Sequence, residues 1–143
     1  MMNLSVILLA SILAGCGTVE TETEKTYSDN DLYILSHIIS AEAGNCSEDM
    51  MIAVGSVVLN RVEDERFPDT IEEVVFQPGQ YSPTWNGTYY AEPTDEAVEV
   101  AEMLLTDGSQ IDESVVWQAE FVQGVGIYEV IESPWGTKMY FCY

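Results

Sequence analysis

The chain of 143 residues is poor in positive charge. It has four Lys and Arg residues against 25 Asp and Glu, which gives a formal net charge of −21. A surface that binds a phosphate backbone needs basic side chains, so this deficit argues against a nucleic-acid-binding protein. Such an acidic surface also repels other polyanions, whereas neutral and cationic partners are tolerated.

Histidine is also scarce, since His37 is the single one in the chain. One histidine leaves no His-based metal cluster and no Ser-His triad of the usual kind. Gly124 and Gly126 lack the strand-to-helix context and the third glycine of a nucleotide-binding loop. We therefore expect no metal and no cofactor, and the chemistry that remains is that of a carboxylate.

Long apolar runs are absent except near the start, where residues 4–13 are almost wholly apolar. This run is short for a membrane span and ends in small residues, as secretory signals do. Its end, Leu-Ala-Gly-Cys at residues 13–16, resembles the lipobox of bacterial lipoproteins. That resemblance implies a signal peptide at residues 1–15, lipidation of Cys16, and an exported protein anchored to the extracytoplasmic face of a bacterial membrane. The alternative is an N-terminal core helix that ends in an ordinary cysteine.

Residues 16–30 are rich in Thr and Glu and have no apolar periodicity, so we interpret them as a lipidated N-terminus and a flexible acidic tether. One folded domain, expected as a monomer, then occupies residues 31–143. Export places Cys46 and Cys142 where a disulfide could persist. The alternative for these two cysteines is a pair of free thiols.

The sequence pattern of the domain changes from helical to extended. Apolar residues recur at spacings of three and four in four segments, which predicts helices near residues 31–42, 48–61, 71–76 and 95–107. Later segments predict strands at residues 115–119, 128–131 and 138–142. This order indicates an α+β fold, with a helical body and a small C-terminal sheet that forms one wall of a cleft.

Glu42 continues the apolar face of the first predicted helix and precedes a Gly-Asn break. Desolvation at the rim of such a face raises the pKa of a carboxyl group, as a general acid near neutral pH requires. The alternative is that Glu42 is one more acidic residue among the 25. His37 lies on another face of the same helix and is expected at the surface or in packing.

Residues 80–90 combine aromatic, hydroxyl and amide side chains with Pro and Gly. Aromatic faces stack on pyranose rings while hydroxyl and amide groups bond to sugar hydroxyls, so this composition suits a carbohydrate. The alternative is a packed surface loop whose aromatic rings cover the core. Arg61, at the end of the second predicted helix, either pairs with an acidic residue of the following turn or orients the wall of the active site.

Five blocks of sequence follow one another in a distinctive order. They are Ile-Ser-Ala-Glu-Ala-Gly (39–44), Ala-Val-Gly-Ser-Val-Val-Leu-Asn-Arg-Val (53–62), Phe-Pro-Asp-Thr-Ile (67–71), Val-Val-Phe-Gln-Pro-Gly-Gln-Tyr-Ser (74–82) and the last strand (136–141). Together they resemble the SleB-type cell wall hydrolases, the family of spore-cortex-lytic enzymes. The resemblance covers residues 32–143 and implies a lysozyme-like fold that cleaves the MurNAc–GlcNAc bond of peptidoglycan.

The resemblance implies that Glu42 is the catalytic acid. The family's loop matches Gln80, Tyr81 and Ser82, and these residues, with Trp85 and Asn86 from the same aromatic segment, are the candidates for binding sugar. The family often has a histidine in its last strand, where this chain offers Thr137, Lys138 or Met139.

Two outcomes of the reaction are open. In a lytic transglycosylase the Glu42 carboxylate takes a proton from the muramyl 6-hydroxyl and gives a 1,6-anhydro product. A hydrolase instead needs a base for water, for which Glu48 and Glu63 are the candidates. Spore cortex, vegetative wall and a phage lysis role are all allowed, and a non-catalytic, lipid-anchored peptidoglycan-binding lipoprotein is the alternative to an enzyme.

Overall fold

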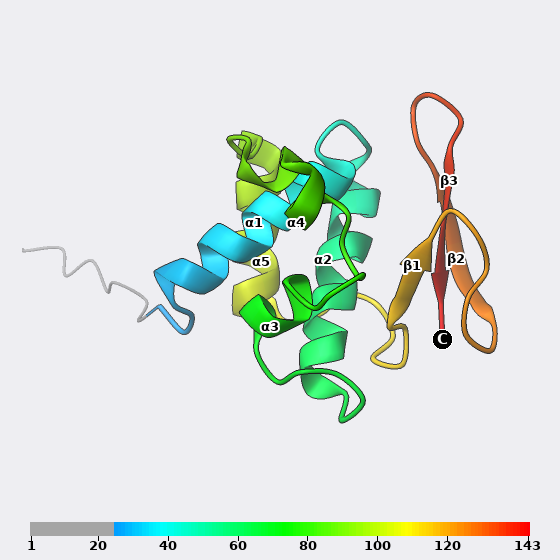
Figure 1. Ribbon diagram of the computed structural model, residues 1–143, viewed down its shortest axis with the longest axis horizontal. Helices are drawn as coiled ribbons and strands as arrows, with labels where there is room; N and C mark the ends of the chain where they lie inside the picture. Colours follow the sequence, from blue (N-terminus) through cyan, green and yellow to red (C-terminus); the bar gives the residue numbers. More distant parts are fainter. Residues whose placement is uncertain (1–24) are drawn as a thin grey trace, which may run out of the picture.

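The computed structural model describes residues 25–143, in which a body of helices stands beside a small sheet (Figure 1). The expected signal peptide, Cys16 and most of the tether lie outside the described residues. None of the helices within residues 25–143 has the length and apolar character that crossing a membrane requires. Helices come first along the chain and strands last, so the predicted α+β order is confirmed.

Three long helices begin at hydroxyl side chains that cap them. Helices α1 (Asp29–Ala43), α2 (Glu48–Glu63) and α5 (Asp95–Asp107) have Ser28, Ser47 and Thr94 as their N-caps. Each cap side chain accepts a hydrogen bond from a backbone N–H in the first turn, and two acidic residues follow in that turn. Both features stabilise a helix N-terminus, which explains why the helices start where they do.

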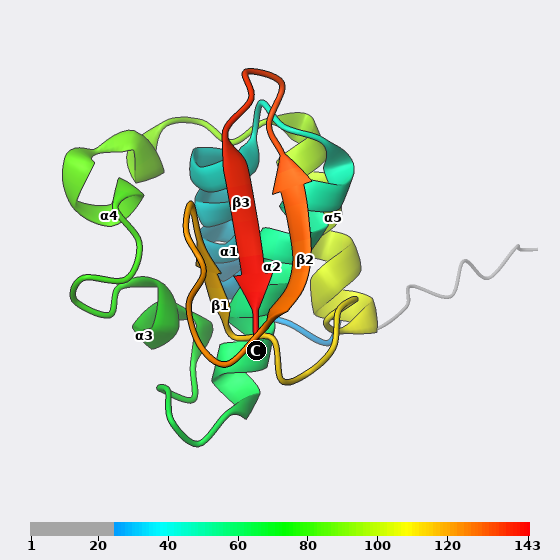
Figure 2. The same ribbon diagram turned by 90° about the vertical axis from the view of Figure 1, so that its right-hand side faces the viewer.

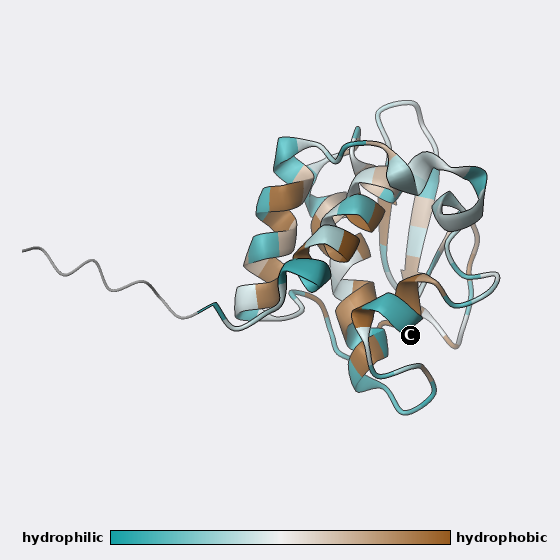
Figure 3. Ribbon diagram, turned by 60° about the vertical axis from the view of Figure 1, so that its left-hand side comes forward, coloured by the Kyte–Doolittle hydropathy of each residue, from teal (hydrophilic) through white to brown (hydrophobic). Residues whose placement is uncertain are grey.

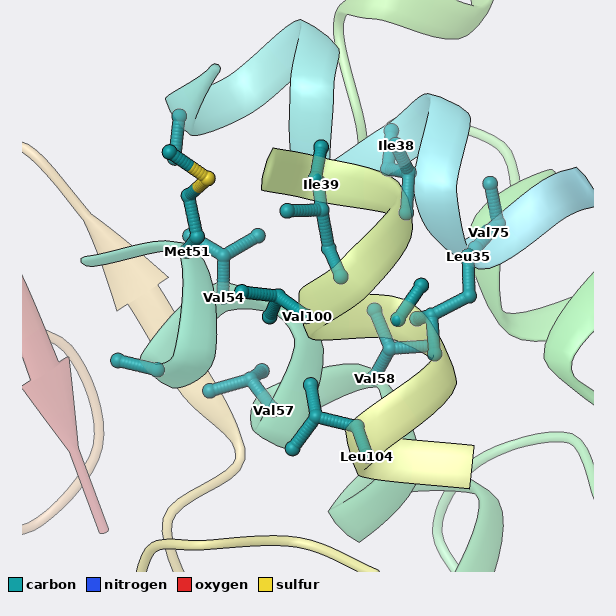
Figure 4. Close-up of a cluster of buried hydrophobic side chains, with 14 of the residues drawn as sticks. Leu35, Ile38, Ile39, Met51, Val54, Val57, Val58, Val75, Val100 and Leu104 are labelled. Atoms are coloured by element: carbon teal, nitrogen blue, oxygen red, sulfur yellow. The ribbon is translucent and has the colours of Figure 1, made fainter. Parts of the chain in front are cut away.

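The core lies where α1, α2 and α5 meet (Figure 4). Each helix alternates polar and apolar residues around its axis, so that one side faces its neighbours (Figure 3). Gly55 lets α2 approach closely, because a Cβ atom there would lie 2.7 Å from Cδ1 of Ile39. Ile39 and Leu104, on the two neighbouring helices, are both fully buried around this glycine. The rigid body that results holds the last turn of α1 in place.

The segment between α2 and α5 contains short helices. Helix α3 (Ile71–Val75) has Thr70 as its N-cap. Helix α4 (Pro83–Asn86) and the 3-10 helix η1 (Thr88–Tyr90) lie in the segment that the sequence predicts as a loop. Tyr89 is 2% exposed, and its ring packs against those of Phe76 and His37. Part of this aromatic segment therefore covers the core, and His37 is a packing residue.

The sheet has the order β1-β3-β2 and both pairings are antiparallel. Its strands are β1 (Trp117–Ala119), β2 (Ile127–Glu132) and β3 (Lys138–Cys142), close to the predicted bounds. Phe141 pairs with Gln118 and is fully buried, which fixes the central strand to the helical body. Figure 2 shows β3 between its two neighbours, in front of α1 and α2.

The disulfide considered from the sequence is not formed, because Cys46 and Cys142 are both free thiols. Cys46 lies in the turn between α1 and α2 and lines a small cavity together with Met139. Cys142 is three residues further along β3, which is about 10 Å at the rise of a β-strand. A disulfide needs its two Cα atoms within about 7 Å, so this register keeps the thiols apart.

Candidate active site

A cavity of about 460 Å³ lies between the helical body and the sheet. The last turn of α1 and the end of α2 form its floor, residues 79–85 form one wall, and residues 117–123 with β3 form the other. Figure 2 shows these elements, with α3 and α4 to one side of the strands. The predicted cleft between the helices and the sheet is therefore present.

Most of the predicted site residues meet in this cavity. Its lining includes five of them: Glu42, Gln80, Tyr81, Ser82 and Trp85. Asn86, the sixth predicted site residue, is not among the lining residues. Its side-chain oxygen accepts hydrogen bonds from the backbone N–H and the hydroxyl of Thr88, at 3.0 and 2.8 Å. Asn86 therefore fixes the turn between α4 and η1.

Glu42 presents its carboxyl group to the cavity from the last turn of α1. Burial raises its pKa from the ordinary value of 4.5 to about 7, while the positive charge of Arg61 opposes this rise. The described residues contain no ion pair between the two side chains. A carboxyl group with this pKa is about half protonated at neutral pH, so it can both give and take a proton there.

Arg61 is 3% exposed and connects three parts of the site. Its Nε donates to the backbone oxygen of Val116 at 2.7 Å, and its Nη1 donates to Oε1 of Gln80 at 3.2 Å. The guanidinium group also lies 5.3 Å from the ring centre of Tyr81 and 5.8 Å from that of Trp117. These contacts tie α2 to both walls of the cavity.

The sequence left two roles open for Arg61, and the structure decides between them. In the charged turn after α2, the carboxylate of Asp64 pairs with Arg66 at 2.6 Å. Arg61 forms no ion pair within the described residues and orients the cavity wall instead.

Two buried polar atoms of the lining have no hydrogen-bond partner within residues 25–143. They are the hydroxyl of Tyr81 and Oε1 of Gln118. Desolvation raises the pKa of Tyr81 to about 12, so its hydroxyl stays protonated and can donate. Buried polar groups without partners are unfavourable, and most of them are satisfied by water or by a ligand. Tyr81 and Gln118 therefore have one unused donor and one unused acceptor beside the cavity, both on atoms that are covered in this structure.

A family model described as cell wall hydrolase matches residues 45–135. The chain belongs to the cell wall hydrolase family. Glu42 lies just before the matched segment.

Curated relatives of the chain are spore cortex-lytic enzymes. The protein from Oceanobacillus iheyensis is 32% identical over 83 residues, which are 58% of this chain and 30% of the relative. The protein from Halalkalibacterium halodurans is 31% identical over 77 residues, which are 54% of this chain and 23% of the relative. The chain thus spans less than a third of the length of these relatives.

Two solved structures share the fold of the chain. The catalytic domain of the Bacillus cereus SleB protein is 22% identical with a TM-score of 0.66, and the match covers 89% of this chain and 100% of that one. The catalytic domain of the germination-specific lytic transglycosylase SleB from Bacillus anthracis is 23% identical with a TM-score of 0.63, covering 82% and 98%. This likeness confirms the predicted helical body with a small antiparallel sheet.

Sequence reasoning missed the residues on the sheet side of the cavity. Trp117, Gln118, Glu120 and Gln123 line it, beside Met139 of the last strand. The apolar alternation of the first strand predicts a strand but does not say which helix that strand faces, because its pairing with β3 is a long-range contact. Met139 lies in the part of the last strand where the family often has a histidine.

The two carboxylates considered as a base for water lie elsewhere in the fold. Glu48 lies in the first turn of α2 and lines a different cavity, next to α5. Glu63 is exposed at the end of α2 and is not part of the lining around Glu42. Glu120, which follows β1, is the second carboxylate of the cavity.

Proposed function

We propose that this protein cleaves the MurNAc–GlcNAc bond of peptidoglycan glycan strands, with Glu42 as the catalytic acid. The observation that carries the proposal is a carboxyl group whose pKa is raised to about 7 by burial, in the cavity between the helical body and the sheet. The family match and the spore cortex-lytic relatives support the same substrate class.

The first step is protonation of the glycosidic oxygen by neutral Glu42. The bond between that oxygen and the anomeric carbon breaks through an oxocarbenium-like state, and Glu42 becomes a carboxylate. Trp85 is 60% exposed at the cavity rim, where its ring can stack on a sugar. The unpartnered hydroxyl of Tyr81 and Oε1 of Gln118 are covered in this structure, and we propose that a small side-chain shift on binding lets them bond to sugar groups.

The second step returns Glu42 to its neutral form. We propose that the carboxylate takes the proton of the muramyl 6-hydroxyl while that oxygen bonds to the anomeric carbon. The product is a 1,6-anhydro sugar, no water is consumed, and a single carboxylate performs both proton transfers. The raised pKa of Glu42 suits both of these roles near neutral pH.

Hydrolysis is the second candidate outcome, because the cavity around Glu42 contains a second carboxylate, that of Glu120. Glu120 is exposed and lines the same cavity as Glu42, so it could accept a proton from an attacking water. A glycosidase that uses water needs this second carboxylate. The structure of the product distinguishes the two outcomes.

The test of the enzymatic function is incubation of the purified domain with peptidoglycan sacculi, followed by mass spectrometry of the soluble fraction. We expect muropeptides with 1,6-anhydro ends from the wild type and none from a folded Glu42→Gln variant. Reducing ends instead of anhydro ends would identify a hydrolase. Sacculi that bind the domain and release nothing at any pH would support the non-catalytic alternative.

We also propose that the full chain is exported and anchored by a lipid on Cys16. The lipobox-like end of the first segment supports this proposal. Metabolic labelling with a fatty acid should mark the wild type and not a Cys16→Ser variant. Equal labelling of both proteins would contradict the anchor.

A further inference from the structure

The cleft does not end at Glu42. A second cavity of about 80 Å³ adjoins the first one and shares three of its lining residues, Glu42, Glu120 and Met139. Its other walls come from the turn between α1 and α2 and from the turn between β2 and β3, which lie next to each other in Figure 2. Glu42 therefore stands between two cavities, as expected of an acid that acts on a bond in the middle of a chain.

An exposed tryptophan forms the outer edge of this second cavity. Trp135 lies in the β2–β3 turn, lines the cavity and is 64% exposed. The turn is held by its own hydrogen bonds, since Ser133 N–H donates to the Thr137 oxygen at 2.8 Å and Thr137 N–H donates to Ser133 Oγ at 3.0 Å. A large aromatic ring on a fixed turn beside a cleft is a ready surface for stacking a sugar.

The size and lining of the second cavity indicate what enters it. A cavity of about 80 Å³ has room for about two to three water molecules, which is less than a pyranose ring requires. Met50 and Met139 offer an apolar surface, and Thr137 offers a hydroxyl group. An acetamido group matches this combination, because it has a methyl group for the apolar side and an amide for the hydroxyl.

We propose that this second cavity is a sugar subsite across Glu42 from the main cavity, which takes the acetamido group of an N-acetylated sugar while the ring of that sugar stacks on Trp135. The inference rests on the proposed function and deepens it, because it explains how the glycan chain continues past the acid. It also predicts selectivity for N-acetylated sugars over plain β-1,4-linked glucose chains.

The first experiment measures turnover of sacculi by single variants. Trp135→Ala should lower kcat/KM about tenfold, mainly through KM, which is the effect of losing one good aromatic stacking contact. Trp135→Phe should recover most of this loss. Tyr90→Ala is the matched control, since Tyr90 is 67% exposed and lines neither cavity, and it should behave as the wild type.

The second experiment measures binding without turnover. In the Glu42→Gln background, isothermal titration should show chitotetraose binding more tightly than cellotetraose, which has the same linkage and no acetamido groups. Adding Thr137→Leu fills the cavity and should remove this preference. Circular dichroism and the melting temperature verify that each variant is folded.

The outcomes of these experiments test the subsite separately from the proposed function. If the wild type is active on sacculi and Trp135→Ala has an unchanged kcat/KM, the subsite proposal is wrong. The proposed function is not affected by that result. A preference for chitotetraose that survives Thr137→Leu would overturn it as well. Absence of any wild-type turnover would count against the proposed function, while the titration still tests the subsite.

Discussion

Arg61 donates a hydrogen bond from Nη1 to Oε1 of Gln80 across 3.2 Å, and this contact joins the end of α2 to one wall of the cavity. The same side chain holds the other wall through Val116. Arg61 is thus a positioning residue: it sets the distance between the walls and places a positive charge near Glu42.

Replacing Arg61 should change both pH dependence and stability. Arg61→Met removes the charge that lowers the pKa of Glu42, so Glu42 stays protonated to higher pH. The alkaline limb of the activity profile should move to higher pH. Loss of the bond to the Val116 oxygen should also cost about 1–3 kcal/mol of stability.

A pH–rate profile and thermal denaturation measure these two effects. Arg66→Met is the control, because Arg66 is exposed and pairs with Asp64 away from the cavity. An alkaline limb that stays in place in the Arg61 variant would show that its charge does not influence Glu42.

Glu42 should make the fold less stable as pH rises. Its pKa is raised from 4.5 to about 7 in the folded state, so the folded state holds a proton that the unfolded chain releases between these values. The stability contributed by the neutral carboxyl is complete below pH 4.5 and is lost as pH rises through about 7. The loss amounts to about 3 kcal/mol, at about 1.4 kcal/mol per pKa unit.

The Glu42→Gln variant isolates this effect from the other acidic residues. The free energy of unfolding, measured in urea at pH 4, 6 and 8.5, should fall more steeply with pH for the wild type than for the variant. Parallel curves would mean that Glu42 is not desolvated in the folded protein.

The Glu120→Gln variant tests which residue accepts the proton in the second step of the reaction. If Glu42 performs both transfers, this variant keeps its activity within a few-fold and still releases 1,6-anhydro products. Mass spectrometry of the muropeptides is the measurement, and Glu113→Gln, an exposed residue outside the cavity lining, is the control. Loss of reducing-end products in the Glu120 variant alone would assign Glu120 as the base of a hydrolase.

The Tyr81→Phe substitution should affect sugar binding and protein stability in different ways. The hydroxyl of Tyr81 is buried and has no partner among the described residues, so removing it should leave stability unchanged or raise it by up to about 1 kcal/mol. If the hydroxyl donates to bound sugar, kcat/KM should fall about tenfold. A variant that loses stability and keeps full activity would reverse this assignment.

The sequence predicts local features of this fold well because their causes are local. The hydroxyl caps at Ser28, Ser47 and Thr94 act within one helical turn, and all three helices begin there. The position of Glu42 at the end of an apolar helix face is predictable for the same reason, because it depends on only about 12 consecutive residues.

The opposite wall of the cavity is not predictable in this way. Trp117 and Glu120 lie 75 and 78 positions after Glu42, and strand pairing with β3 brings them to it. Composition also does not reveal the contact that Asn86 makes, in which its side-chain oxygen accepts hydrogen bonds from Thr88 and fixes the turn. Composition indicates what a segment can bind, whereas the backbone decides which side chains are available.

The strand order β1-β3-β2 has a consequence for assembly. Strands β1 and β2 are not neighbours, and each pairs only with β3, which is the last of the three along the chain. Until residues 138–142 join the sheet, the helices can pack, but β1 and β2 have no strand between them to pair with. The sheet wall of the cavity therefore forms only when β3 docks, which is a long-range and hence late step of folding.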